Sequence, residues 1–428
     1  MDWPFGIALL LALMLLGVPI AFALAIVGVL GTVSIIGWEP ALSLLAQTWF
    51  DNARNDSLAV LPLFLMMGNF VMQSGVAEEL YAAANAWLRH RRGGLAMATV
   101  VACGGFSSVC GSSLATAATM TRIALPSMRR YGYPDGLATA SIAAGGTLGI
   151  LIPPSVILVF YGILTRQDIG QLFIAGVVPG LIGVVGYALA VRVSILWRRI
   201  DLPVEPPLPV AERVRALRGV AGALGLFLFV MGGIYLGVFT VTEAAGCGAG
   251  GALLLTLARG RLRLADTFAT LFDTAKMTAV MFFILFGALT FTNYVNLSGM
   301  TSDLRAGLAL LGDNPLLVIL VILGVYLVLG CVLESLSMLV LTVPIFYPVA
   351  EALGYDLIWF GIFVVVATEI SYITPPVGMN AFVLSSVVPG LRVGTVFRGL
   401  VPFVLADLVR VALLIAVPAI ALLLPSLM

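Results

Sequence analysis

The stretch GTLGILIPPSVILVFYGI, residues 146–163, holds a Pro-Pro pair in the middle of an apolar run. A second stretch, ISYITPPVGMN at 370–380, repeats this arrangement with Pro375 and Pro376. Proline has no backbone N–H and clashes with the preceding helical turn, so it breaks a helix. Backbone groups freed within a bilayer must find partners in protein, water or a ligand. The two stretches therefore predict two membrane helices that are broken where polar groups are needed.

The composition predicts a polytopic all-α membrane protein. The chain has 428 residues, of which 61% are hydrophobic and 10% charged, whereas a soluble domain carries about 25% charged residues. Apolar runs of membrane-spanning length recur along it, without the ~10-residue alternation that is typical of membrane β-strands. The formal net charge of +1 gives no indication of a nucleic-acid partner.

Few residues suggest other chemistry. The cysteines have no CxxC spacing, so we interpret them as packing residues rather than metal ligands or disulfides; they are Cys103, Cys110, Cys247 and Cys331. His90 lies within the basic cluster RHRR and is expected to be a loop charge. The N-terminus has no basic region before its apolar run, so it is predicted to be a membrane segment rather than a cleaved signal peptide.

The chain matches itself at a nearly constant offset. Phe50–Arg54 recurs as Phe272–Lys276, and the Gly-Tyr and Pro-Pro pairs at 132–133 and 153–154 recur at 354–355 and 375–376, all shifted by 222. Pro126 and Pro348 share this offset, and the motif at 176–179 recurs at 399–402. These matches predict a duplication, with repeats at 1–197 and 219–428 joined by a polar, proline-bearing cytoplasmic linker at 198–218.

Each repeat is expected to contain a re-entrant helical hairpin. Arginines flank both ends of the run 93–126, which places both ends in the cytoplasm. Its 34 residues are too few for two full spans, and its middle, CGGFSSVCGSSLAT, is rich in Gly and Ser. The matching run at 315–350 has no basic cluster at its flanks and is expected to enter from the opposite side.

Counting crossings predicts that the repeats are inverted. The second repeat is expected to cross five times, through the run 219–258 with a break near Thr240–Glu243, and then at 276–295, 357–385 and 399–425. The first repeat is expected to cross at 5–17, 20–36, 57–74, 137–163 and 170–197. An odd number of crossings turns the second repeat upside down relative to the first.

Inverted repeats with discontinuous helices are typical of secondary transporters, in which helix ends and unwound carbonyls hold ions and substrate. We predict two sodium sites, because the tips and breaks are rich in hard oxygen donors and small residues. Sodium site 1 comprises Ser107, Ser108, Cys110, Gly111, Ser112, Thr147, Gly149 and Pro154. Sodium site 2 comprises Gly330, Glu334, Ser335, Ser371, Thr374 and Val377, with Ser337, Pro376 and Asn380 grouped beside it. The expected substrate-binding residues are Ser112, Ser113, Ser155, Glu334 and Asn380. No other metal and no cofactor is expected; the alternative is that these small residues only permit close helix packing.

Charged residues within apolar runs are costly and often functional. Glu334 at the second tip is the main acidic candidate, and Glu369 is expected either to support the site or to serve packing. Asp407 and Arg410 lie one helical turn apart and are expected to form a structural pair. Arg54 and Lys276 occupy matching positions near predicted segment ends, where their side chains would reach the interface.

The motifs also carry a family resemblance. CGSSLATAATMTRIALPSMRRYGY at 110–133, the stretch at 146–163, GCVLESLSMLVLTVPIFYPVAEALGYD at 330–356 and ITPPVGMNAFV at 373–383 resemble the large permease subunit of tripartite ATP-independent periplasmic (TRAP) transporters. The resemblance covers essentially the whole chain. It implies a multi-pass protein of the bacterial inner membrane that imports an organic acid, such as a C4-dicarboxylate or sialic acid, by sodium symport. It also implies a small four-helix membrane subunit and a periplasmic substrate-binding protein as partners, an elevator mechanism, and two sodium sites at the residues above.

Three positions depart from the family pattern. Cys110 stands where the family usually has Ser, Ser371 where it has Gly, and Glu334 where it more often has Asp. An ion contact through a backbone carbonyl would survive the first two changes, whereas one through a hydroxyl at position 110 would not.

Three other functions are considered. A stand-alone sodium-coupled dicarboxylate or citrate symporter of the same superfamily would need neither partner, so a neighbouring gene for either partner would count against it. An intramembrane enzyme would need a Ser/His pair, a histidine metal cluster or an Asp dyad, and the sequence has none, so no enzyme is expected. A channel fits poorly with two occluding hairpins and inverted breaks, which favour alternating access.

Overall fold

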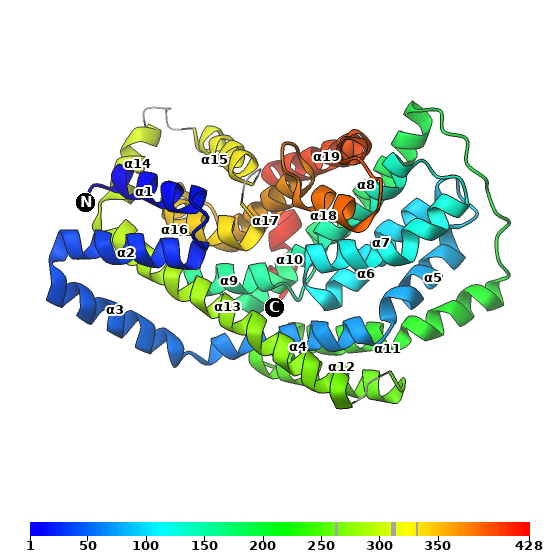
Figure 1. The fold of residues 1–428 in the computed structure, drawn as a ribbon, viewed down its shortest axis with the longest axis horizontal. Coiled ribbons are helices and arrows are strands. Elements are labelled where there is room, and N and C mark those ends of the chain that lie inside the picture. The colour runs from blue at the N-terminus through cyan, green and yellow to red at the C-terminus, as the bar shows by residue number, and fades with distance from the viewer. Residues whose placement is uncertain (262–263, 310–313, 331–332) are drawn as a thin grey trace.

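The computed structural model describes residues 1–261, 264–309, 314–330 and 333–428, and every regular element within them is helical (Figure 1). The first half contains α1 (Trp3–Leu15), α2 (Ile20–Ile36), α3 (Trp38–Ala53), η1 (Asp56–Ala59), α4 (Val60–Gln73), α5 (Val76–Leu88), α6 (Gly94–Cys110), α7 (Ser113–Arg130), α8 (Asp135–Thr147), η2 (Leu148–Ile150), α9 (Val156–Thr165) and α10 (Ile169–Trp197). The second contains α11 (Val210–Tyr235), α12 (Val241–Ala258), α13 (Leu264–Leu297), α14 (Met300–Ala309), α15 (Pro315–Leu329), α16 (Ser335–Ala352), α17 (Leu357–Ile373), α18 (Met379–Val387), α19 (Val393–Ala416), α20 (Ala419–Leu422) and η3 (Pro425–Leu427).

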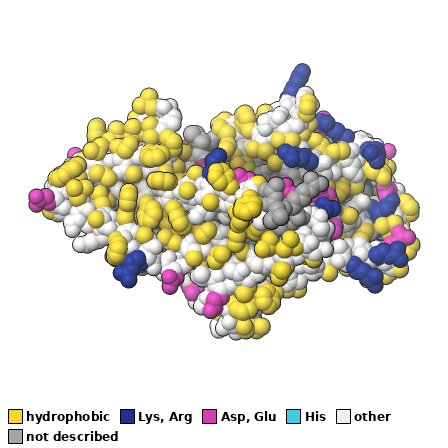
Figure 2. All heavy atoms as spheres, turned by 60° about the horizontal axis from the view of Figure 1, so that its bottom comes forward, with side chains coloured by type: hydrophobic (Ala, Val, Ile, Leu, Met, Phe, Trp, Pro, Cys, Tyr) yellow, Lys and Arg dark blue, Asp and Glu magenta, His cyan; other side chains and the backbone are white. Residues whose placement is uncertain are grey.

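Several helices are suited to a bilayer. Within the described residues, seven helices are long and apolar enough to cross a membrane; they span Asp56–Gln73, Ile169–Trp197, Val210–Tyr235, Val241–Ala258, Asp266–Leu297, Ser335–Ala352 and Val393–Ala416. Figure 2 shows hydrophobic side chains over much of one face, with many of the Lys and Arg side chains gathered towards one end. An exposed apolar face of this kind is stable in lipid, which makes the chain a multi-pass membrane protein.

The helix boundaries follow the offset of 222 residues seen in the sequence. This offset carries both ends of α7, Ser113 and Arg130, onto the ends of α16, Ser335 and Ala352. It also carries the first residue of α8, Asp135, onto the first residue of α17, Leu357. Agreement at this level supports an internal duplication. The inverted orientation of the repeats in a membrane remains a prediction.

Helices of each half pack against helices of the other half in matching pairs. The half-helix α9, which follows the first Pro-Pro pair, packs on α16 of the second half, and α18, which follows the second pair, packs on α7 and α8 of the first. Likewise α10 packs on α17 while α19 packs on α8. The peripheral helices are paired in the same way, α2 with α13 and α4 with α12. Neither half therefore forms its own core alone.

Three details differ from the predicted segments. The helices α3, α5 and α14 were not among them, and the linker 198–218 already contains the start of α11 at Val210. The helix α13 is continuous and begins at Leu264, so Lys276 lies within a helix rather than near an end. The expected break between two crossings of 219–258 is present, because α11 ends at Tyr235 and Thr240 caps α12 in a capping box with Glu243.

Candidate functional site

The first interruption lies between α8 and α9. The α-helix stops at Thr147, a short 3₁₀ turn follows, and helix resumes at Val156 after the cis bond between Pro153 and Pro154. Ser155 holds the new start, because its hydroxyl donates to the carbonyl of Ile150 and accepts from the N–H of Leu158 at 3.4 Å. The break is thus a defined connection between two helices.

The tip of the first hairpin packs against this break. The turn between α6 and α7 consists of Gly111, in the left-handed region with φ 65°, and Ser112, whose side chain caps α7 by accepting from Ala115 at 3.4 Å. A Cβ added to Gly149 would lie 3.1 Å from Ser107 Oγ and 3.2 Å from the Ser112 carbonyl oxygen. A Cβ on Gly111 would lie 3.1 Å from the Pro154 carbonyl oxygen. Glycine at 111 and 149 therefore lets the tip and the break approach backbone to backbone.

One hydroxyl at this contact lacks a hydrogen bond. Ser107 Oγ is fully buried and has no partner among the described residues. Leaving a buried hydroxyl unpaired costs roughly 1–3 kcal/mol, so such a group calls for an explanation such as a bound ion. The neighbouring Ser108 differs, because its hydroxyl donates to Gly105 of its own helix at 2.7 Å. Cys110 is only partly buried.

The second interruption lies between α17 and α18. Helix α17 stops at Ile373, Thr374 is extended, the bond between Pro375 and Pro376 is cis, and Gly378 with φ 55° precedes α18. The Thr374 hydroxyl donates to the Ile370 carbonyl at 3.0 Å. Val377 and Pro376 stand in the non-helical connection, the former partly buried and the latter exposed.

The second hairpin tip also packs against its break. A Cβ on Gly330, which caps α15, would overlap the side chain of Ser371. On the other arm, the Tyr372 hydroxyl donates to Ser335 Oγ at 2.7 Å and accepts from the Ser335 N–H at 2.9 Å. Glu334 stands at the N-cap of α16 and is exposed. Ser337 is buried one turn further on. Cys331 lies outside the described residues.

Asn380 lies at a different place from the one expected. Sequence reasoning grouped it with the second site, whereas its side chain reaches the first hairpin. Its Oδ1 accepts from Ser113 Oγ at 3.1 Å, and its Nδ2 donates to the Ala143 carbonyl at 2.8 Å. The reason is the exchange of half-helices, which seats α18 on α7 and α8. The structure thus joins two predicted substrate-binding residues, Ser113 and Asn380, in one contact.

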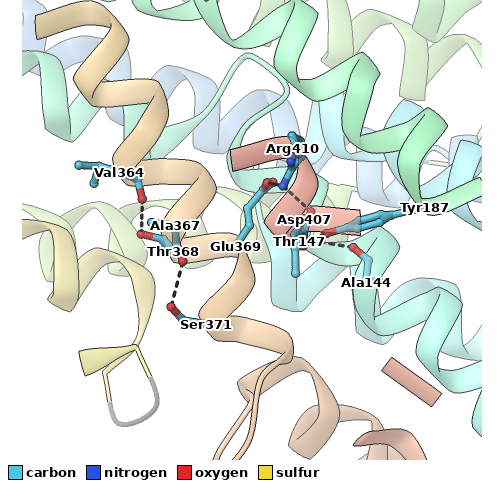
Figure 3. A network of polar contacts seen from close by, with 10 residues as sticks. All are labelled: Ala144, Thr147, Tyr187, Val364, Ala367, Thr368, Glu369, Ser371, Asp407 and Arg410. Atoms are coloured by element: carbon cyan, nitrogen blue, oxygen red, sulfur yellow. Dashed lines mark hydrogen bonds and ion pairs between the residues drawn. The ribbon is translucent and has the colours of Figure 1, made fainter. Parts of the chain in front are cut away.

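A buried polar network joins side chains of α8, α10, α17 and α19 (Figure 3). Arg410 of α19 pairs with Glu369 of α17 and, at 2.8 Å, with Asp407 of its own helix. The Tyr187 hydroxyl of α10 donates to Asp407 Oδ2 at 2.6 Å and lies 3.0 Å from Thr147 Oγ1. All five side chains are 3% exposed or less. The expected pairing of Asp407 with Arg410 is present, but sequence reasoning missed Tyr187 and the role of Glu369 in this network.

Thr147, which was expected at sodium site 1, turns its hydroxyl towards this network. Its Oγ1 also contacts the Ala144 carbonyl at 2.8 Å. Taken together, the chain is multi-pass and helical, and each of its interrupted helices faces a hairpin tip. This is the architecture of a secondary transporter.

Comparisons with known proteins give the family. The model of the "Tripartite ATP-independent periplasmic transporter, DctM component" family matches residues 7–420. The chain is 38% identical over 401 residues to a C4-dicarboxylate TRAP transporter large permease protein of Pseudomonas aeruginosa, covering 93% of each. It is 32% identical over 418 residues to a sialic acid TRAP transporter large permease protein of Vibrio cholerae, covering 97% of each. The chain belongs to the TRAP large permease family and is a multi-pass protein of the bacterial inner membrane.

A solved structure has a related fold. The YdaH transporter of Alcanivorax borkumensis superposes with a TM-score of 0.63 over 91% of this chain and 89% of its own. The sequence identity is 16%, so this likeness concerns the fold alone.

Proposed function

We propose that this chain is the large membrane subunit of a sodium-coupled, binding-protein-dependent secondary transporter that imports an organic acid. The observation that carries the proposal is the contact of a hairpin tip with a broken helix in each half, with the unpaired Ser107 hydroxyl at the first contact. A C4-dicarboxylate is the first candidate substrate, because the relative named for it is more similar than the one named for sialic acid.

In the first proposed sodium site, Ser107 Oγ and main-chain carbonyls of the tip and the break supply the oxygen ligands. Hard oxygen ligands of this kind suit an alkali cation. The carbonyls of Ser112 and Pro154 border the two glycines at this contact. Cys110 takes part only through its backbone, so the loss of a hydroxyl at this position is tolerated. The second site is formed in the same way by Gly330, Ser371 and Thr374.

The substrate is proposed to bind between the two tips. Helix α7 begins at Ser113 in the first tip, α16 at Ser335 in the second tip, and α9 at Val156 after the first break. Helix N-termini favour anions because their N–H groups are free and their dipoles are positive. Ser112 and Ser155 already cap two of these starts, and Asn380 fixes Ser113, so these residues shape the pocket. Glu334 is exposed at the N-cap of α16 and is proposed to line the pocket at the third start.

The transport cycle is proposed to follow an elevator mechanism. The hairpins α6–α7 and α15–α16 pack with the broken helices into one group, whereas α2, α4, α12 and α13 pair with one another outside it. In this proposal the first group moves against the second and carries sodium and substrate together. The inverted repeats relate the outward-facing state to the inward-facing state. Delivery by a periplasmic binding protein and assembly with a small membrane subunit belong to the same proposal.

Reconstitution tests the proposal. Proteoliposomes that contain this chain, its small subunit and the binding protein should take up radiolabelled succinate when sodium is higher outside than inside. Replacing that gradient with an equal potassium gradient should reduce uptake to the level of empty liposomes. Equal uptake with potassium, or uptake driven by ATP alone, would overturn sodium coupling. Sodium-driven uptake by the permease alone would instead favour a stand-alone symporter.

A further inference from the structure

The buried network joins two equivalent positions of the repeats. Thr147 and Glu369 are separated by the same 222 residues that relate α7 to α16. Thr147 is the last residue of α8 before the first break, and Glu369 lies one helical turn before Ile373, where α17 ends at the second break. Between them run Tyr187, Asp407 and Arg410, each in contact with the next. The chain of contacts thus runs from one break to the other (Figure 3).

Each charged residue of the network has an uncharged counterpart in the first half of the chain. The match of 176–179 with 399–402 gives an offset of 223 for α10 and α19, at which Arg410 corresponds to Tyr187 and Asp407 to Val184, while Glu369 corresponds to Thr147 at 222. Uncharged side chains therefore suffice for packing at the equivalent positions. A role beyond packing is expected of the charged version, because replacing a buried ion pair by apolar groups is often neutral or stabilising.

The charges of the network do not cancel. Two carboxylates face one guanidinium, and all three side chains are almost fully buried. Within the described part of the chain, Glu369 Oε1 and Arg410 Nε and Nη1 have no hydrogen-bond partner. In a low-dielectric interior a partly satisfied network responds strongly to a nearby charge. A cation that binds at either break brings such a charge.

We infer that Thr147, Tyr187, Asp407, Arg410 and Glu369 are positioning residues that couple the two breaks, so that sodium bound at one raises the sodium affinity of the other. This inference rests on the proposed function. Thr147 holds the end of α8 next to Gly149, and Glu369 holds α17 next to Ser371, so the network fixes the direction of both broken helices. Coupled sites load together, which prevents transport with only one ion.

A substitution at Tyr187 can interrupt the network without removing a charge. Its hydroxyl is the link between Asp407 and Thr147, while its ring packs edge-on against Phe403 with centroids 5.7 Å apart. Tyr187→Phe removes the link and keeps the ring. Tyr161→Phe is the matched control, because Tyr161 is equally buried and its hydroxyl donates to the Leu357 carbonyl outside the network.

The experiment is a double-mutant cycle in which the sodium affinity of the purified permease is measured. The affinity is obtained from the rise in unfolding temperature as NaCl is added, while the total concentration of NaCl plus KCl is held constant. Ser107→Ala alters the first site and Thr374→Ala the second, singly and together. With Tyr187 present, the fold-change in sodium affinity of the double variant should differ from the product of the two single fold-changes by about 5-fold or more. In Tyr187→Phe the effects should multiply to within about 2-fold, and in Tyr161→Phe the deviation should remain.

Three outcomes would contradict the inference. If the deviation persists in Tyr187→Phe, or if Tyr161→Phe abolishes it equally, the network does not couple the sites while sodium binding stands. If the two sites are already independent in the parent protein, there is no coupling to explain. If NaCl and KCl stabilise the permease equally, sodium binding itself fails, and the proposed function falls together with this inference.

Discussion

Asn380 of α18 hydrogen-bonds Ser113 at the start of α7, although 267 residues separate the two in the sequence. The same amide donates to the Ala143 carbonyl of α8, so one side chain from the second half ties two helices of the first. The packing of α9 on α16 is the reciprocal contact. Each hairpin is thus completed by a half-helix of the other repeat, and the two candidate sites form only when both halves are folded.

Asn380→Ala should therefore weaken the first hairpin. The substitution leaves Ser113 Oγ and the Ala143 carbonyl without this partner, which should lower the free energy of unfolding by roughly 1–3 kcal/mol. Ser386→Ala is the control on the same helix, because Ser386 is exposed and its hydroxyl donates to the Val383 carbonyl of its own helix at 2.8 Å. Thermal unfolding in detergent measures both. Equal stability of the two variants would show that Asn380 does not anchor the hairpin.

The second tip and break can be tested by a pair of substitutions. Gly330→Ala places a methyl group where the Ser371 side chain lies, so sodium-driven uptake should fall by at least about tenfold, as misplacements of this size do at functional sites. Ser371→Gly removes the obstruction, and the double variant should recover most of the uptake. If Ser371→Gly fails to rescue Gly330→Ala, the two residues do not meet in the working protein.

The buried ion network should respond unequally to the loss of its charges. Arg410→Gln leaves Glu369 and Asp407 as two uncompensated buried carboxylates, which should destabilise the protein by about 3–5 kcal/mol. Glu369→Gln keeps the shape of the side chain and leaves Asp407 paired with Arg410, so its cost should be clearly smaller. Unfolding temperatures of the two purified variants decide the matter. The reverse order would mean that Glu369 is the indispensable charge.

Much of the fold could be predicted because its signals are local. Apolar runs of about 20 residues indicate membrane helices, and a Pro-Pro pair interrupts a helix, so the breaks after α8 and α17 follow from the sequence. Single prolines, such as Pro126 and Pro179, remain inside helices. The continuity of α13 across Asp273 and Lys276 did not follow, because those charges also fit a segment end. Hydropathy indicates which residues are stable in lipid, but it does not mark where a helix ends, because the helix is held by its own backbone hydrogen bonds.

The site could be predicted in part. Gly and Ser at the tips marked the residues that approach the breaks, since close backbone contact needs small side chains. The position of Asn380 could not be read, because exchange of half-helices between repeats leaves no local pattern. Tyr187 gave no signal either, since a tyrosine in an apolar helix most often serves packing. The lone charge of Glu369 within an apolar run was the available sign that the pair of Asp407 and Arg410 had a third charged member.

The most direct measurement is the amount of sodium bound to the purified permease, counted with radioactive sodium by equilibrium dialysis. At a sodium concentration that saturates the parent protein, Ser107→Ala and Thr374→Ala should each lose close to one ion per chain. Ser194→Ala should lose none, because this buried serine lies near the end of α10 and belongs to neither tip and neither break. Full sodium binding in both site variants would contradict the claim that the tips and breaks hold the coupling ions.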